Sequence, residues 1–199
     1  MEDLIKKILI SKNLKARFLN TLSLLEYIGA RKILKSQPQE SFHAQLLNHV
    51  AEEIRHAQLL KRMALKLEPD LCMTYEPKAL LCGGDAVDYF QALDHAAQKE
   101  FFETDSWISY LYTTYLVEKR ATSFYQAIDN MLIEMKNPPL FRGILVEEDR
   151  HLDDIKKALE KVPSARARLV TLQKIEAEAF SKLVQVLHAA LEEQLQEVF

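Results

Sequence analysis

Residues 50–60 read V-A-E-E-I-R-H-A-Q-L-L, and residues 145–155 read L-V-E-E-D-R-H-L-D-D-I. Both stretches contain Glu-Glu-x-Arg-His, so Glu53 is followed three residues later by His56, and Glu148 by His151. On an α-helix, residues i and i+3 share a face, where a carboxylate and an imidazole can bind the same metal ion. One such pair supplies half of a site, and two facing pairs supply most of a two-metal site.

A further Glu-x-x-His, at Glu40 and His43, does not belong to this pattern. Glu40 lies thirteen residues before Glu53, which places it about 140° away around the helix at ~100° per residue. It also lacks the surrounding Glu-Glu-x-Arg-His. The repeat, rather than the spacing alone, therefore makes the signal specific.

A single glutamate precedes each repeated pair. Glu26 lies 27 residues before Glu53, and Glu118 lies 30 residues before Glu148. Either interval fits half a helix, a short turn and half an antiparallel helix. The order Glu, Glu-x-x-His, Glu, Glu-x-x-His resembles the ligand set of the ferritin-like di-iron and di-manganese carboxylate proteins. The resemblance covers about residues 12–160.

This resemblance implies an all-α fold, a ferritin-like four-helix bundle with a long crossover after the second helix. The sequence adds an extra C-terminal helix, which the resemblance does not imply. The resemblance implies one metal bound mainly by Glu26, Glu53 and His56, and a second bound mainly by Glu118, Glu148 and His151. The glutamates of the repeated pairs are expected to bridge the two ions.

Apolar periodicity independently predicts long helices with the candidate ligands near their middles. The predicted helices span about 13–35, a stretch ending near 67, 86–136 with a break near Thr104, 139–161 and 164–198. Leu19, Leu22, Glu26, Ala30 and Ile33 form the inner stripe of the first long helix. A carboxylate within such a stripe is costly to bury unless it is paired or bound to a cation.

Residues 68–84 are the one long irregular stretch, because two prolines and Gly83-Gly84 preclude a continuous helix. The stretch separates the two half-repeats, where a ferritin-like bundle requires its crossover. We therefore expect a single domain over 1–199, with a core at about 12–160 and an accessory helix at about 164–198. That helix is expected either to cover the bundle or to build a homodimer.

Composition limits the class of protein. The chain has 199 residues, of which 48% are hydrophobic and 28% charged, with only 4 Gly and 6 Pro. The net charge of −3 argues against a dedicated nucleic-acid binder. We expect a cytoplasmic protein without a membrane span, because the chain has neither an uninterrupted signal-peptide core nor a run of ~20 apolar residues. Cys72 and Cys82 are expected to be reduced thiols, with a disulfide across the crossover as the alternative.

Carboxylate and imidazole ligands suit iron or manganese. Two iron ions are the first expectation, and manganese or a mixed site is the alternative. Two ferrous ions can together deliver two electrons to dioxygen. The sequence therefore predicts a non-haem di-iron oxidoreductase that activates dioxygen, an oxidase or hydroxylase of an unidentified organic substrate. Electrons would come from an external donor, since no flavin, haem or iron–sulfur motif is visible.

Two alternatives stay open: a ferroxidase or peroxide-handling protein of bacterioferritin or rubrerythrin type, and a non-catalytic helical interaction module stabilised by metal. Three further residues are candidates for the chemistry. Thr122 lies one turn after Glu118, where bacterial multicomponent monooxygenases have a pocket threonine, and a hydroxyl that bonds within its own helix is the alternative. Tyr27 and Tyr115 are near enough to the predicted ligands to be redox-active, with aromatic packing as the alternative.

Overall fold

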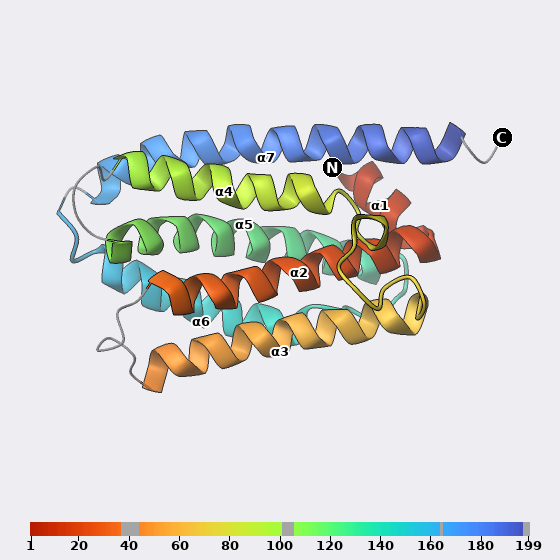
Figure 1. The fold of residues 1–199 in the computed structure, drawn as a ribbon, viewed down its shortest axis with the longest axis horizontal. Coiled ribbons are helices and arrows are strands. Elements are labelled where there is room, and N and C mark those ends of the chain that lie inside the picture. Colours follow the sequence, from red (N-terminus) through yellow and green to blue (C-terminus); the bar gives the residue numbers. More distant parts are fainter. Residues whose placement is uncertain (37–43, 101–105, 164, 197–199) are drawn as a thin grey trace. The chain divides into compact units, whose positions relative to one another are not determined.

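The computed structural model describes residues 1–36, 44–100, 106–163 and 165–196, and within these ranges the chain is helical and contains no strand. The all-α prediction is thus confirmed for this part of the chain. Figure 1 labels its elements, which are α1 (Glu2–Ile10), α2 (Lys12–Ser36), α3 (Ala44–Leu67), the 3-10 turn η2 (Pro77–Ala79), α4 (Gly83–Glu100), α5 (Ser106–Glu134), α6 (Arg142–Leu159) and α7 (Ala165–Gln196).

Helix boundaries lie close to the predicted ones. The long helices α2, α6 and α7 begin and end within about three residues of the predicted limits, as is usual for ends read from sequence. Because α4 begins at Gly83, the irregular segment covers 68–82 rather than 68–84. The predicted break at Thr104 lies outside the described residues.

The described chain divides into two compact units, which we call unit 1 and unit 2. Unit 1 contains residues 1–35, 44–89 and 180–196, and unit 2 contains residues 90–100, 106–163 and 165–179. Unit 1 therefore holds α2 and α3, whereas unit 2 holds α5 and α6. Each unit contains one of the two half-repeats, and the single domain over 1–199 stays a prediction.

Unit 1 is built on the antiparallel pair α2 and α3, which run side by side in Figure 1. The predicted stripe of α2 is buried along its whole length, from Leu19 to Ile33. Between the helices, the buried Ser23 hydroxyl donates a hydrogen bond of 2.7 Å to the carbonyl oxygen of Ala57. This bond fixes the register of α2 against α3 one turn before Glu26 and next to His56.

The irregular segment 68–82 is held against α2 by side chains that bind its backbone. The Asn20 amide donates to the carbonyl oxygens of Thr74 and Ala79 at 3.0 and 2.9 Å. The Arg17 guanidinium donates twice to the carbonyl oxygen of Leu80, at 2.8 and 3.1 Å. The segment is irregular in secondary structure, and its carbonyl groups nevertheless have specific partners.

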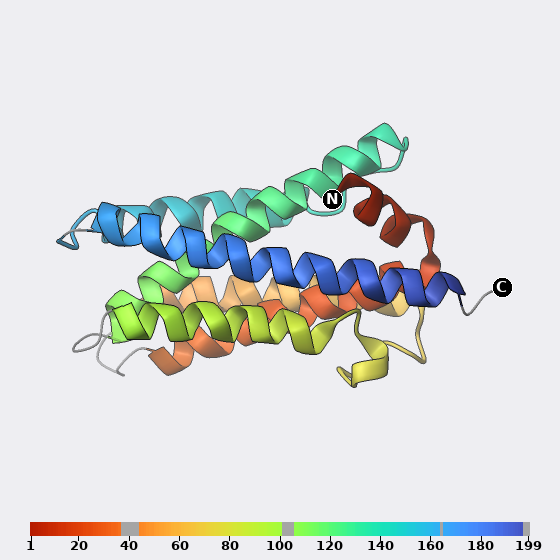
Figure 2. The same ribbon diagram turned by 90° about the horizontal axis from the view of Figure 1, so that it is seen from above.

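Unit 2 is built on the antiparallel pair α5 and α6, whose course is seen from a second side in Figure 2. Asp129 on α5 is buried and accepts hydrogen bonds from the backbone N–H groups of Leu140 and Phe141, at 2.7 and 3.1 Å. The Phe141 ring also stacks on Tyr125, with ring centroids 4.4 Å apart. These contacts fix where α6 begins relative to α5, and so the level of its ligands.

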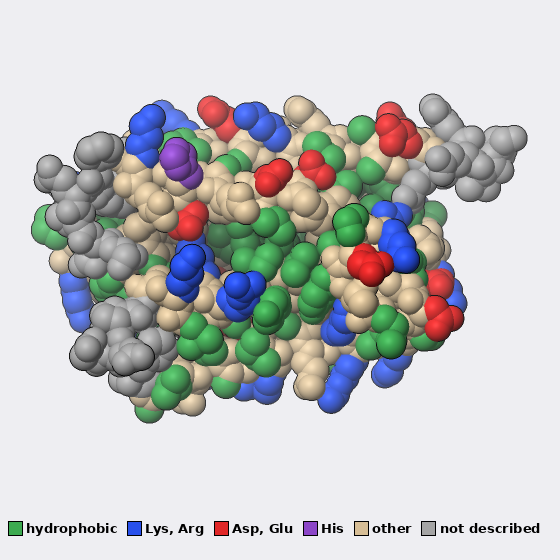
Figure 3. Space-filling model, viewed as in Figure 1, with side chains coloured by type: hydrophobic (Ala, Val, Ile, Leu, Met, Phe, Trp, Pro, Cys, Tyr) green, Lys and Arg blue, Asp and Glu red, His purple; other side chains and the backbone are tan. Residues whose placement is uncertain are grey.

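The surface shows charges of both signs. Figure 3 shows acidic and basic side chains interspersed over the visible face. Some form exposed ion pairs within a helix, such as Lys157 with Asp153 on α6. No helix in the described ranges is long and apolar enough to cross a membrane.

Replacing Asp129 by alanine is expected to destabilise the protein by about 2 kcal/mol, because buried backbone N–H groups at the start of α6 would lose their acceptor. Urea unfolding followed by circular dichroism would measure the change. Glu134→Ala is the control, since it removes an exposed carboxylate from the same helix. Equal free energies of unfolding for the two variants would contradict this role of Asp129.

Candidate metal centre

The first group of predicted ligands lies in unit 1, on the facing surfaces of α2 and α3. Glu26 is 9% exposed, Glu53 7% and His56 3%. Glu26 belongs to the buried stripe of α2, and Glu53 and His56 share the inner face of α3 because they are three residues apart. We call these three residues the first half-site.

The first half-site could hold a metal ion. Glu26, Glu53 and His56 each offer one ligand atom, and these atoms lie within 4.8 Å of one another. His56 Nδ1 lies 4.0 Å from Glu26 Oε2. Two carboxylates this close repel each other in a buried site, and a cation between them removes that repulsion. Oxygen and imidazole donors at this spacing could therefore hold a metal ion.

Gly29 leaves room for the carboxylate of Glu53. A Cβ atom built at Gly29 would lie 3.1 Å from Glu53 Oε2, closer than ordinary van der Waals contact. Glycine in a helix interior costs about 1 kcal/mol relative to alanine. Gly29 therefore lowers the stability of α2 at the point where Glu53 approaches the α2 backbone.

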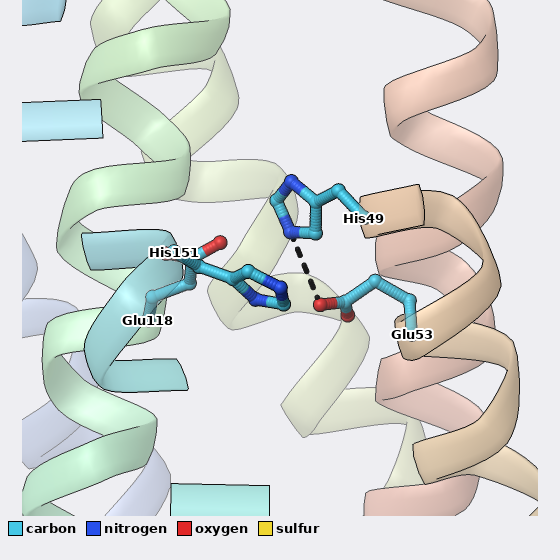
Figure 4. Close-up of side chains that lie close together, drawn as sticks. All are labelled: His49, Glu53, Glu118 and His151. Carbon is cyan, nitrogen blue, oxygen red and sulfur yellow. Dashed lines mark ion pairs between the residues drawn. The ribbon is translucent and has the colours of Figure 1, made fainter. Parts of the chain in front are cut away.

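His49 lies directly beside this half-site. Its Nε2 atom is 3.2 Å from Glu53 Oε1, an ion pair if the imidazole is protonated, and Figure 4 shows the two side chains on successive turns of α3. Such a contact orients a ligand in the way that outer partners of metal ligands do. The neighbouring Glu52 is also buried, with one oxygen 3.8 Å from the Arg55 guanidinium.

The second group lies in unit 2, on α5 and α6, and we call Glu118, Glu148 and His151 the second half-site. All three side chains are buried. Glu118 and His151 offer ligand atoms within 4.8 Å of each other, and Figure 4 draws both side chains. His151 Nδ1 also lies 3.8 Å from Glu148 Oε2. The structure thus brings together the residues of each half-site within its own unit.

The two cysteines offer no alternative ligands. Both are free thiols, Cys72 buried and Cys82 half-buried. Burial raises the pKa of the Cys72 and Cys82 thiols, and neither cysteine belongs to the groups of described residues that could hold a metal ion. The donor set is therefore carboxylate and imidazole.

The three residues predicted to take part in catalysis occupy different environments. Thr122 Oγ1 on α5 is buried and has no hydrogen-bond partner among the described residues. Tyr115 is half-buried and has the Lys119 ammonium 5.7 Å from its ring centroid. Tyr27 is 38% exposed and stacks on Tyr75, with ring centroids 6.4 Å apart. Catalytic roles for Thr122, Tyr27 and Tyr115 stay predictions.

Sequence reasoning missed two buried carboxylates with specific partners, Asp129 on α5 and Glu176 on α7. The two oxygens of Glu176 accept hydrogen bonds from Nε and Nη2 of Arg120 on α5, each at 2.7 Å. A signal for it was present, because Glu176 lies one turn after the buried Leu172 and interrupts an apolar stripe as Glu26 does. No spacing motif linked it to Arg120, which lies 56 residues earlier.

Comparison with known proteins gives no assignment, because no protein-family model, curated protein or solved structure matches the chain. Function must therefore be inferred from the buried carboxylates and imidazoles themselves.

Gly29→Ala is expected to raise the stability of the metal-free protein and to lower its affinity for metal. The metal-free variant should melt at a higher temperature than wild type, because alanine favours the helix by about 1 kcal/mol and the flexible Glu53 carboxylate can give way. Its affinity for Mn(II), measured by titration calorimetry, should fall about tenfold, a typical effect of disturbing a group that orients a ligand.

Gly143→Ala on α6 is the matched control, because a Cβ there meets nothing within 4 Å. It should leave Mn(II) affinity unchanged. Wild-type affinity in Gly29→Ala would show that the close approach of Glu53 is dispensable.

Proposed function

We propose that the first and second half-sites close around two metal ions, so that α2, α3, α5 and α6 form a ferritin-like four-helix bundle. The observation that carries this proposal is the buried cluster of Glu26, Glu53 and His56, whose ligand atoms lie within 4.8 Å of one another. The same set of side chains, two glutamates and a histidine, recurs buried on the antiparallel pair in unit 2. Each half-site alone has fewer ligands than a pair of metal ions needs.

The charges of the combined site favour two divalent ions. Four carboxylates bring four negative charges, and two divalent cations balance them without leaving excess charge in a buried site. In this proposal Glu26 and His56 serve one ion, and Glu118 and His151 the other. The remaining glutamates, Glu53 and Glu148, would supply further carboxylate oxygens to these ions.

We propose further that the protein is a non-haem di-iron oxidoreductase acting on an organic substrate. Bound ferrous ions would supply electrons for the reduction of dioxygen. The chain contributes the ligands and a water-poor environment: Leu22, one turn before Glu26, and Leu60, one turn after His56, are both buried. Low water access strengthens electrostatic interactions at the site and prevents side reactions.

Thr122 is our candidate for handling protons near the second half-site. Its buried hydroxyl lies one turn after Glu118 and has no hydrogen-bond partner within the described ranges. A hydroxyl can both donate and accept, so it can hold a proton for a reacting group. Tyr27 and Tyr115 are the candidates for electron transfer, the former because its exposed ring could meet an external donor.

Anaerobic reconstitution with Fe(II) is the experiment that tests this proposal. We expect about two irons per chain, measured after desalting, and oxidation of both on addition of oxygen without further uptake. Continued uptake of many irons per chain would instead indicate a ferroxidase. No binding of either Fe(II) or Mn(II) would overturn the proposed metal centre.

The double variant Glu53→Ala, Glu148→Ala should lose stoichiometric metal binding while retaining its helical circular dichroism. Metal normally stabilises a folded protein that binds it, so the rise in melting temperature on adding Mn(II) should also disappear. Asp149→Asn is the control on α6, where it removes an exposed charge next to Glu148. Glu40→Ala and His43→Ala, at positions outside the described residues, should also bind metal normally. Full metal content in the double variant would refute the ligand assignment.

A further inference from the structure

Helix α5 has partners on two opposite faces. One face presents Glu118, which has a ligand atom within 4.8 Å of one on His151 of α6. Arg120 follows Glu118 by two residues, which places it about 200° further around the helix at ~100° per residue. It pairs there with Glu176 of α7. The rotation of α5 about its axis therefore decides both contacts together.

The contact between Arg120 and Glu176 restricts how α5 can turn relative to α7. Two guanidinium nitrogens meet two carboxylate oxygens, each at 2.7 Å, so the pair is bidentate. A bidentate pair restricts orientation as well as distance, unlike a single ion pair. Glu176 is only 6% exposed, whereas the Arg120 side chain is 32% exposed. Loss of the arginine would remove this bidentate partner from a buried charge, which disfavours the arrangement.

We propose that α7 is a clamp on α5, and that Arg120 and Glu176 are positioning residues that keep Glu118 turned toward α6. In this proposal α7 supplies no ligand to the second half-site but holds α5, and with it Glu118, in position. The effect on metal binding rests on the proposed function, whereas the effect on α5 itself does not. The clamp acts within unit 2, so the first half-site should be insensitive to it.

The clamp can be tested first in metal-free protein by hydrogen–deuterium exchange. Glu176→Gln keeps the shape of the side chain and removes its charge. We expect backbone amides of α5 near residues 114–122 to exchange about tenfold faster than in wild type, since local opening would become easier. Glu178→Gln, the same change at an exposed position of α7, should leave exchange unchanged. Equal exchange in both variants would overturn the clamp.

Arg120→Lys and the reversed pair Arg120→Glu, Glu176→Arg extend this test. Lysine keeps the charge but cannot make two parallel hydrogen bonds to the carboxylate. The backbone amides of α5 should therefore still exchange faster than in wild type. The reversed pair should exchange more slowly than Glu176→Gln, because it restores the attraction between the helices. Wild-type exchange in Arg120→Lys would show that bidentate geometry is unnecessary. Arg120→Lys also keeps the proposal testable if Glu176→Gln fails to fold.

The positioning role is tested by Mn(II) titration of the same variants. We expect wild type to bind two equivalents and Glu176→Gln to bind one normally and the other at least about tenfold more weakly. Equal weakening of both equivalents, or of neither, would mean that the pair only stabilises the fold. If wild type binds no metal, the proposed function fails, and the exchange experiment still decides whether α7 clamps α5.

Discussion

A carboxylate inside a protein must have a compensating partner, and much of this structure consists of such partners. Asp129 accepts hydrogen bonds from backbone N–H groups at the start of α6. Glu176 receives a guanidinium from Arg120. Glu26 and Glu53 lie instead beside each other and beside imidazoles. The first two arrangements neutralise one carboxylate each, whereas the third gathers negative charge, which is why it indicates a cation site.

Three contacts fix different parts of the structure. Asp129 sets the start of α6 along α5, and Arg120 sets the rotation of α5 against α7. Ser23 fixes the register of α2 against α3 through the backbone at Ala57. Together these contacts hold each half-site within its own unit before any metal ion is considered. In the proposed centre, the ligands of each half-site would already lie close together before metal binds. Binding would then order fewer side chains, which reduces the entropy lost on binding.

The features that repeat along the chain could be predicted from the sequence. Periodicity predicted the inner stripe of α2, including Glu26, and the Glu-x-x-His spacing predicted that Glu53 and His56 share a face. The pairing of Arg120 with Glu176 could not be predicted, because it depends on how α7 packs and has no fixed spacing. The burial of Glu52 is another tertiary effect, since its sequence neighbours place it at the edge of the stripe.

The irregular segment 68–82 has a consequence for which substitutions the chain can tolerate. Asn20 and Arg17 of α2 bind carbonyl oxygens of this segment, and Thr21 Oγ1 accepts a hydrogen bond from the backbone N–H of Leu81. These contacts recognise main-chain atoms, which nearly every amino acid shares. Selection on these hydrogen bonds should therefore act mainly on α2, while an exposed side chain of the segment such as Met73 can diverge. The side chain of Leu80 is buried and stays constrained by packing.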